Sequence, residues 1–122
     1  MKRLISSFGF AFKGLRYATL TQPNFRIHLV LGFIAIVLGI LLQISFAEWE
    51  WIMLSIAIVL VTELLNTGIE TLTDLVSPGY NEKAGHVKDV CAAAVVIAAL
   101  FALITGIAIF LPKLILLITH AV

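Results

Sequence analysis

The stretch WIMLSIAIVLVTELLNTGIETLTDLV, residues 51–76, combines an apolar run with a group of acids. Residues 51–62 carry no charge, and apolar residues then recur at helical spacing until SPGY breaks the pattern. Glu63, Glu70 and Asp74 lie inside the same segment. The stretch therefore predicts a membrane-spanning helix that carries acidic side chains.

The composition of the whole chain assigns it to the membrane class. Of its 122 residues, 61% are hydrophobic and 12% are charged, whereas soluble globular domains carry roughly 45–50% apolar and about 25% charged residues. Too few polar residues remain to coat a second, soluble core, so we expect a single membrane domain over residues 1–122. The lone Cys91 excludes an internal disulfide and a cysteine-rich metal site.

Two further segments are long and apolar enough to cross a bilayer. No charged residue occurs from Leu29 to Ala47 or from Val90 to Leu111, and each run approaches or exceeds the roughly 20 residues that a spanning helix requires. If only these two runs crossed the membrane, the long apolar segment between them would also have to lie in lipid, so a hairpin of two spans is excluded. We therefore expect an all-α integral membrane protein with spans at 27–47, 49–76 and 82–111, followed by a tail at 112–122.

Residues 1–22 predict a different kind of helix. Apolar side chains fall on one stripe at about 100° per residue, and basic side chains lie opposite. The stripe contains Leu4, Ile5, Phe8, Ala11, Phe12 and Leu15, and the opposite face contains Lys2, Arg3, Lys13 and Arg16. We expect an amphipathic helix that lies on the membrane surface and ends before Pro23.

The distribution of basic residues predicts the orientation. Residues 1–28 hold five Lys or Arg and no acid, the turn SFAEWE holds acids but no Lys or Arg, and the connection SPGYNEKAGHVKD holds two lysines. Cytoplasmic segments of membrane proteins are enriched in Lys and Arg. The N-terminus and the connection before the third span are therefore expected to be cytoplasmic.

Helical spacing places the polar residues of the acidic stretch on one face. With Glu63 as zero, Asn66, Glu70 and Asp74 fall near about 300°, 340° and 20°. Glu63 lies roughly 18 Å along the helix from Trp51 and Glu70 roughly 28 Å, which places Glu63 in the inner half of the membrane and Glu70 near its boundary. Carboxylates at such depths normally face a partner or a wet cavity.

The start of the third span offers such a partner, because HVKD places His86, Lys88 and Asp89 at the same depth. Carboxylates can hold Mg²⁺, basic side chains can neutralise phosphate oxygens, and one carboxylate can accept the proton of an attacking alcohol. The mixture suits phosphoryl transfer from a metal-bound nucleotide to a lipid alcohol. No Walker phosphate loop and no protein-kinase motif is present.

Each feature also has a purely structural interpretation. The acidic stripe can be a polar network that fixes oligomer geometry, or a conduit for ions or protons. Lys88 and Asp89 can form an ordinary interfacial charge pair. His28 and His86 could bind metal, but two isolated histidines are more often polar interface residues. Close helix packing explains the small residues Ala94, Ala98, Ala102 and Gly106.

ELLNTGIETLTDLVSPGY, residues 63–80, followed by AGHVKDVCAAAVVIAAL and preceded by FGFAFKGLRYA, resembles the prokaryotic diacylglycerol kinase family, which includes undecaprenol kinases. The resemblance covers about residues 3–110. It implies a homotrimer in the bacterial inner membrane, with one surface helix and three spans per subunit and active sites shared between neighbours. It implies transfer of the γ-phosphate of Mg-ATP to a lipid hydroxyl, with no nucleic-acid partner.

The resemblance also implies roles for individual residues. Glu63 matches the general base, and together with Lys13 it is expected to contact the lipid. Glu70 matches a metal ligand that also binds ATP, and Gln22 occupies the position of a second metal ligand that is usually Glu. An amide oxygen can coordinate Mg²⁺, but with one negative charge less. The other expected ATP contacts are Arg3, Phe10, Asn66, Gly79, Tyr80, Asn81, Lys88 and Asp89.

Two questions stay open at the level of sequence. RIH in the first span and LVSPGY after the second are more similar to undecaprenol kinases, yet both undecaprenol and diacylglycerol reach the interface in the same way. The competing interpretation of the whole chain is a weakened or non-catalytic oligomeric membrane protein of the same fold, in which Gln22 marks lost metal binding.

Overall fold

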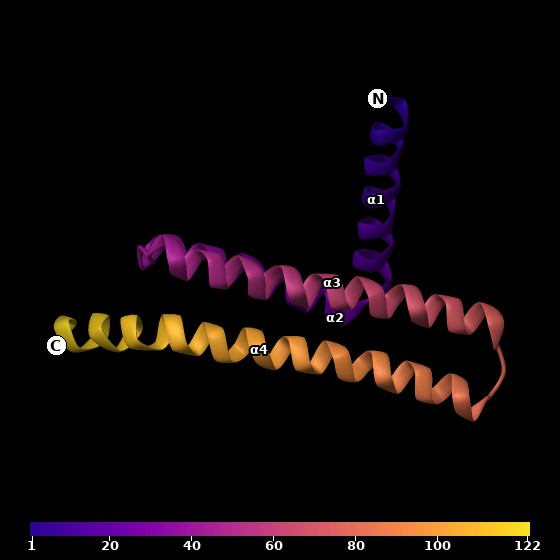
Figure 1. The fold of residues 1–122 in the computed structure, drawn as a ribbon. Coiled ribbons are helices and arrows are strands. Elements are labelled where there is room, and N and C mark those ends of the chain that lie inside the picture. Colours follow the sequence, from indigo (N-terminus) through magenta and orange to yellow (C-terminus); the bar gives the residue numbers. More distant parts are fainter.

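The computed structural model describes residues 1–122 and consists of four helices. They are α1 (Lys2–Thr21), α2 (Pro23–Leu41), α3 (Phe46–Val76) and α4 (Glu82–Ala121). α3 and α4 lie side by side and antiparallel, α2 packs along α3, and α1 projects away from the other three (Figure 1). The predicted all-helical architecture is confirmed.

Helices α2, α3 and α4 are each long and apolar enough to cross a membrane, as predicted. Within one chain their surfaces are largely uncovered: only 11% of the most apolar window of α2 is buried, and 17% of that of α4. Apolar surface of this extent requires lipid or another protein chain around it. The helices therefore form a membrane domain whose outer faces are left for such neighbours.

The joint between α1 and α2 is built from Gln22 and Pro23. Gln22 is extended, with φ −115° and ψ 105°. Pro23 is the first residue of α2, where a backbone N–H would have no partner within the helix, so proline loses no hydrogen bond there. The Arg26 guanidinium donates to the carbonyl oxygens of Thr19 and Leu20, at 2.9 and 3.3 Å. These bonds satisfy carbonyls at the end of α1 and hold the two helices at their joint.

The start of α3 is closed by a capping box. The Glu48 N–H donates to the Ser45 hydroxyl at 3.2 Å, and the Ser45 N–H donates to Oε1 of Glu48 at 3.0 Å. The same Oε1 lies 3.2 Å from Nζ of Lys113 on α4. One carboxylate thus caps α3 and also ties it to α4.

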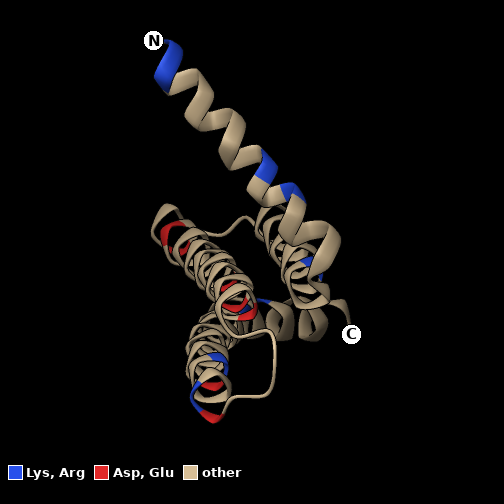
Figure 2. Ribbon diagram, turned by 90° about the vertical axis from the view of Figure 1, so that its right-hand side faces the viewer, with Lys and Arg blue, Asp and Glu red and all other residues tan.

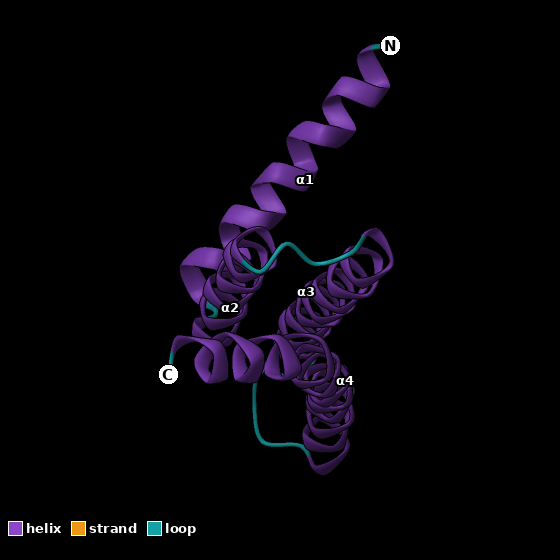
Figure 3. Cartoon of the chain, turned by 90° about the vertical axis from the view of Figure 1, so that its left-hand side faces the viewer, coloured by secondary structure: helices purple, strands orange, loops and turns teal.

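Helix α4 continues through Pro112 to Ala121, so residues 112–122, expected as a tail, are almost wholly helical. Pro112 has no N–H to donate to the preceding turn, and the last turns of α4 bend away from the rest of the helix (Figure 3). Beyond the bend, Leu114 packs against the buried cluster of Ile44, Ile52 and Phe110.

The Gly39→Ala substitution tests how tightly this end of the bundle is packed. A Cβ at Gly39 would lie 2.6 Å from Cη2 of Trp49 and 3.1 Å from Cδ1 of Ile44. Because the indole ring must move, we expect a loss of about 1–3 kcal/mol in the free energy of unfolding, measured in detergent micelles. The matched control is Gly106→Ala, whose new Cβ would meet only a Phe110 ring carbon at 4.0 Å. Equal stability of the two variants would contradict the prediction.

Candidate functional site

Glu63 lies on the face of α3 that packs inside the chain. The buried residues of α3 form one stripe, which consists of Ile52, Ser55, Val59, Glu63 and Thr67. The exposed fraction of Glu63 is 3%. A carboxylate buried to this extent needs a hydrogen-bond donor or a cation nearby.

His28 of α2 faces this carboxylate. Nδ1 of His28 lies 3.6 Å from Oε1 of Glu63, which is too long for a hydrogen bond. Neither atom has a hydrogen-bond partner within the chain, and Oδ1 of Asn66, one turn along α3, also has none. Buried polar atoms in native proteins are nearly always hydrogen-bonded, so these three atoms mark groups whose hydrogen bonds are not completed within the unliganded chain.

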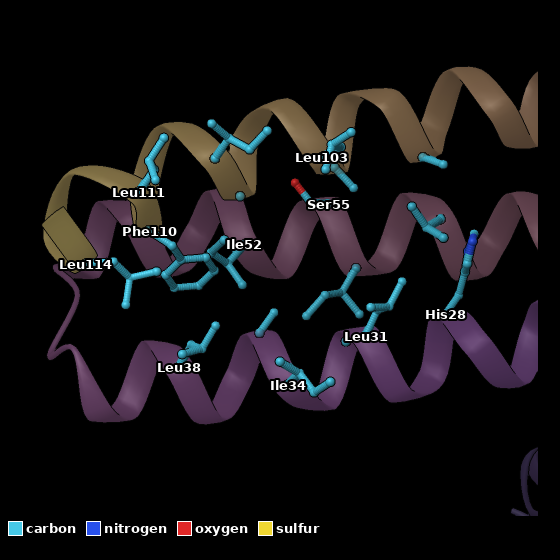
Figure 4. A pocket seen from close by; sticks show the side chains of 18 residues that line it. His28, Leu31, Ile34, Leu38, Ile52, Ser55, Leu103, Phe110, Leu111 and Leu114 are labelled. Carbon is cyan, nitrogen blue, oxygen red and sulfur yellow. The ribbon is translucent and has the colours of Figure 1, made fainter.

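An apolar groove extends from this polar cluster along α3, between α2 and α4 (Figure 4). Its volume is about 480 Å³. His28 lies at one end, and Phe110 and Leu114 lie at the other (Figure 4). Apart from His28 and Ser55, the lining consists of apolar side chains and glycine. The groove therefore ends at His28, and the Glu63 carboxylate lies behind that side chain, 3.6 Å from its Nδ1, without lining the groove itself.

Lys88 forms an ion pair with Asp74 across the α3–α4 connection. Nζ of Lys88 lies 2.5 Å from Oδ1 of Asp74, and both side chains are partly exposed. The interpretation of Lys88 and Asp89 as a charge pair is therefore wrong, since neighbouring residues on a helix point about 100° apart. Asp74 was not among the expected site residues. Its place on the polar face of α3 was the feature of the sequence that could have indicated its contact with Lys88.

The α3–α4 connection contains the other residues expected to bind nucleotide. Oδ1 of Asn81 accepts from the Ala84 N–H at 3.1 Å and so caps the start of α4. Tyr80 is 98% exposed, and no side chain approaches the position of a Cβ at Gly79. The connection is therefore fixed at its α4 end by the Asn81 cap, and Tyr80 and Gly79 are open to solvent.

The basic residues at the start of α1 lie apart from the rest of the site. α1 makes no contact with α4, which carries Lys88, and its N-terminal end projects away from the bundle (Figure 2). Arg3 and Phe10 are exposed, and Nζ of Lys13 lies 5.5 Å from the centre of the Phe10 ring. A single chain does not bring these α1 residues to Lys88 and Asp89, the residues of α4 that are expected to bind nucleotide.

Gln22 and Glu70 lie at the same level of the antiparallel α2–α3 pair. From the contact of His28 with Glu63, Gln22 lies roughly 9 Å back along α2 and Glu70 roughly 10 Å on along α3. The chain forms no cluster of three His, Cys, Asp or Glu side chains. Mg²⁺ is commonly held by one or two carboxylates, with water and nucleotide phosphates as the remaining ligands. The two residues fit a site of that kind.

Comparison with known proteins places this arrangement in a family. Residues 9–110 match the family described as prokaryotic diacylglycerol kinase. The chain belongs to this family. The membership predicted from the polar motifs is therefore confirmed.

Several relatives in this family are similar over most of the chain. A Synechocystis diacylglycerol kinase is 40% identical over 91% of the chain and 64% of its own length. An undecaprenol kinase of Bacillus subtilis is 36% identical over 93% of each protein. A diacylglycerol kinase of Escherichia coli strain K12 is 34% identical over 84% of each. All three names are those of lipid kinases, which confirms the predicted enzyme class.

His28 is the residue of this site that sequence reasoning missed. It was interpreted as a polar interface residue, because its spacing from Glu63 in the sequence says nothing about contact between them. The sequence feature that could have identified His28 is its place at the start of the first apolar run, because it is the one ionisable side chain between Arg26 and Glu48.

Reversal of the Asp74–Lys88 pair tests the contact that joins α3 to α4 at this end. Asp74→Lys places two cations together, so we expect the free energy of unfolding to fall by up to about 1 kcal/mol. Adding Lys88→Asp should restore most of that loss, because the pair is then reversed rather than broken. Unfolding in micelles measures both variants. Independent, additive effects of the two substitutions would show that the pair does not contribute.

Proposed function

We propose that this protein is an ATP-dependent kinase that transfers the γ-phosphate of Mg-ATP to the hydroxyl of a membrane lipid alcohol. The observation that carries the proposal is the buried Glu63 carboxylate, whose Oε1 has no hydrogen-bond partner, next to His28 at the end of an apolar groove. A lipid alcohol has the matching chemistry, with one polar group on a long apolar chain. Membership of a family whose relatives are named as lipid kinases supports the same reaction.

Glu63 is the general base in this proposal. It accepts the hydroxyl proton of the lipid as the oxygen attacks the γ-phosphorus and the bond to the leaving ADP oxygen breaks. The amide group of Asn66, one turn further along α3, can donate to a phosphate oxygen. Lys88 offsets negative charge on the nucleotide. Glu63 and Asn66 lie on one face of α3, and Lys88 lies on α4 beside Asp74.

Glu70 and Gln22 would hold the magnesium ion that accompanies ATP. Such an ion neutralises charge on the transferring phosphates. Glu70 supplies a carboxylate, and Gln22 supplies a neutral amide oxygen in place of the carboxylate that is usual in the family. The chain therefore brings one negative charge less to the metal, which weakens its attraction to Mg²⁺.

The complete site is proposed to form between copies of the chain in a homotrimer. α1 does not reach α4 of its own chain, so Arg3 and Phe10 would meet the nucleotide site of a neighbour. The exposed apolar faces of the three long helices leave room for such contacts. With α1 amphipathic and on the surface, and with the basic N-terminus cytoplasmic, the site would face cytosolic ATP in a bacterial inner membrane.

Undecaprenol is the proposed preferred alcohol, with diacylglycerol as the alternative. RIH and LVSPGY support this choice, and so does the match to the Bacillus subtilis undecaprenol kinase over 93% of both proteins. A second candidate function, a non-catalytic membrane oligomer, is favoured by Gln22 alone. The same assay separates all three possibilities.

The decisive experiment is a competition assay in mixed micelles with labelled Mg-ATP and both lipid alcohols. We expect labelled undecaprenyl phosphate, and we expect Glu63→Gln to lower kcat by about 100-fold or more with an unchanged KM for ATP, because a base acts on the transferred proton. Glu50→Gln, an exposed acid at the opposite end of α3, is the control. Absence of both lipid phosphates would refute the proposal. Equal loss of ATP binding in Glu63→Gln would instead make Glu63 a nucleotide or metal ligand.

The metal assignments predict opposite shifts in the magnesium requirement. Gln22→Glu restores a carboxylate, so half-maximal activity should need less Mg²⁺, whereas Glu70→Gln removes one and should need more. Titration of activity with Mg²⁺ at fixed ATP measures both. An unchanged requirement in either variant would remove that residue from the metal site. An inactive parent protein that gains activity only as Gln22→Glu would favour the degenerate relative.

A further inference from the structure

Glu63 has one ion-pair partner within the chain, and it is His28. From α4 no charge can reach it, because no charged residue occurs from Val90 to Leu111. With Asp74 opposite Lys88, the antiparallel register puts Ala99 of α4 level with Glu63, and Ala99 lines the groove there. The remaining cation of α2, Arg26, is occupied by carbonyls at the end of α1. Of the ionisable side chains that α2 and α4 carry, His28 is thus the one that faces this carboxylate.

We propose that His28 is a positioning residue for Glu63 in the phosphoryl transfer. Its Nδ1–H donates to Oε1, which holds the carboxylate in one rotamer and leaves Oε2 free for the lipid hydroxyl. The inference rests on the proposed function, because it assigns Glu63 the role of base. The proton of the lipid goes to Glu63, and His28 acts only through that carboxylate.

The unliganded geometry is close to that bond without forming it. The separation of 3.6 Å must shorten by about 0.6 Å to reach an ordinary N–H···O distance. Both atoms lie unpartnered and buried, so neither loses another hydrogen bond by moving. His28 also lines the end of the groove, so the pair lies in apolar surroundings, where a hydrogen bond is electrostatically stronger than in water.

Asparagine and glutamine distinguish positioning from packing at this residue. The amide nitrogen of Asn lies near the position of Nδ1 of a histidine, whereas that of Gln lies near the position of Nε2. Because Nδ1 faces Glu63, His28→Asn should keep most of the parent kcat and His28→Gln should keep less. His28→Leu removes the donor and should lower kcat by about 10-fold to 100-fold, the usual effect of losing a hydrogen bond to a charged group.

The measurements are kcat and KM for Mg-ATP in mixed micelles, together with the unfolding temperature of each variant. KM for ATP should stay unchanged, since His28 touches the base and not the nucleotide residues. His120→Leu, at the exposed end of α4, is the matched control and should match the parent in every respect. If His28→Leu does not fold, the comparison of Asn with Gln still decides.

Two outcomes would overturn the inference while leaving the proposed function in place. In the first, Glu63→Gln is inactive but His28→Leu turns over like the parent. In the second, Asn, Gln and Leu lower kcat equally and in step with the unfolding temperature, which would make His28 a packing residue. A parent protein that phosphorylates neither alcohol would remove the proposed function itself, and this inference with it.

Discussion

The structure depends on the cost of placing a carboxylate inside an apolar helix bundle. Placing an ionised side chain within the bilayer costs about 3 kcal/mol or more of free energy, so such a residue is usually functional or paired with another polar group. Glu63 is buried on the inner face of α3, against His28 of α2, which lines the end of the groove. His28 and the end of the apolar groove lie next to that group, and Asn66 lies one turn further along the same helix.

The two ends of the helix bundle differ in how their polar groups are paired. At the end that contains Ser45, the capping box closes α3, Glu48 pairs with Lys113, and Trp49 packs on Gly39. At the end that contains Glu63, buried polar atoms are left without partners inside the chain. The contacts that stabilise the fold and the polar groups of the candidate site thus lie at different places along the same helices. Hydrogen-bonded groups hold their positions, whereas buried groups without partners can still form hydrogen bonds.

Much of the site could be predicted because its residues lie on one helix. The face shared by Glu63, Asn66, Glu70 and Asp74 follows from 100° per residue, without knowledge of any other helix. The partners of those residues could not be predicted. A charge pair between Lys88 and its neighbour Asp89 was one alternative from the sequence, whereas the structure pairs Lys88 with Asp74, because proximity in sequence is a poor guide to contact between helices. His28 was missed for the same reason.

By itself, the sequence determined the class of protein, the three apolar helices, the family and the polar face of the acidic stretch. These depend on composition and on the period of a helix, which are local properties of the chain. Only the tertiary structure decided which helices face one another: His28 against Glu63, Asp74 against Lys88, and Leu114 beyond the Pro112 bend against the buried cluster. Such contacts depend on how helices pack and in what register. The spacing of residues within one helix does not contain that information.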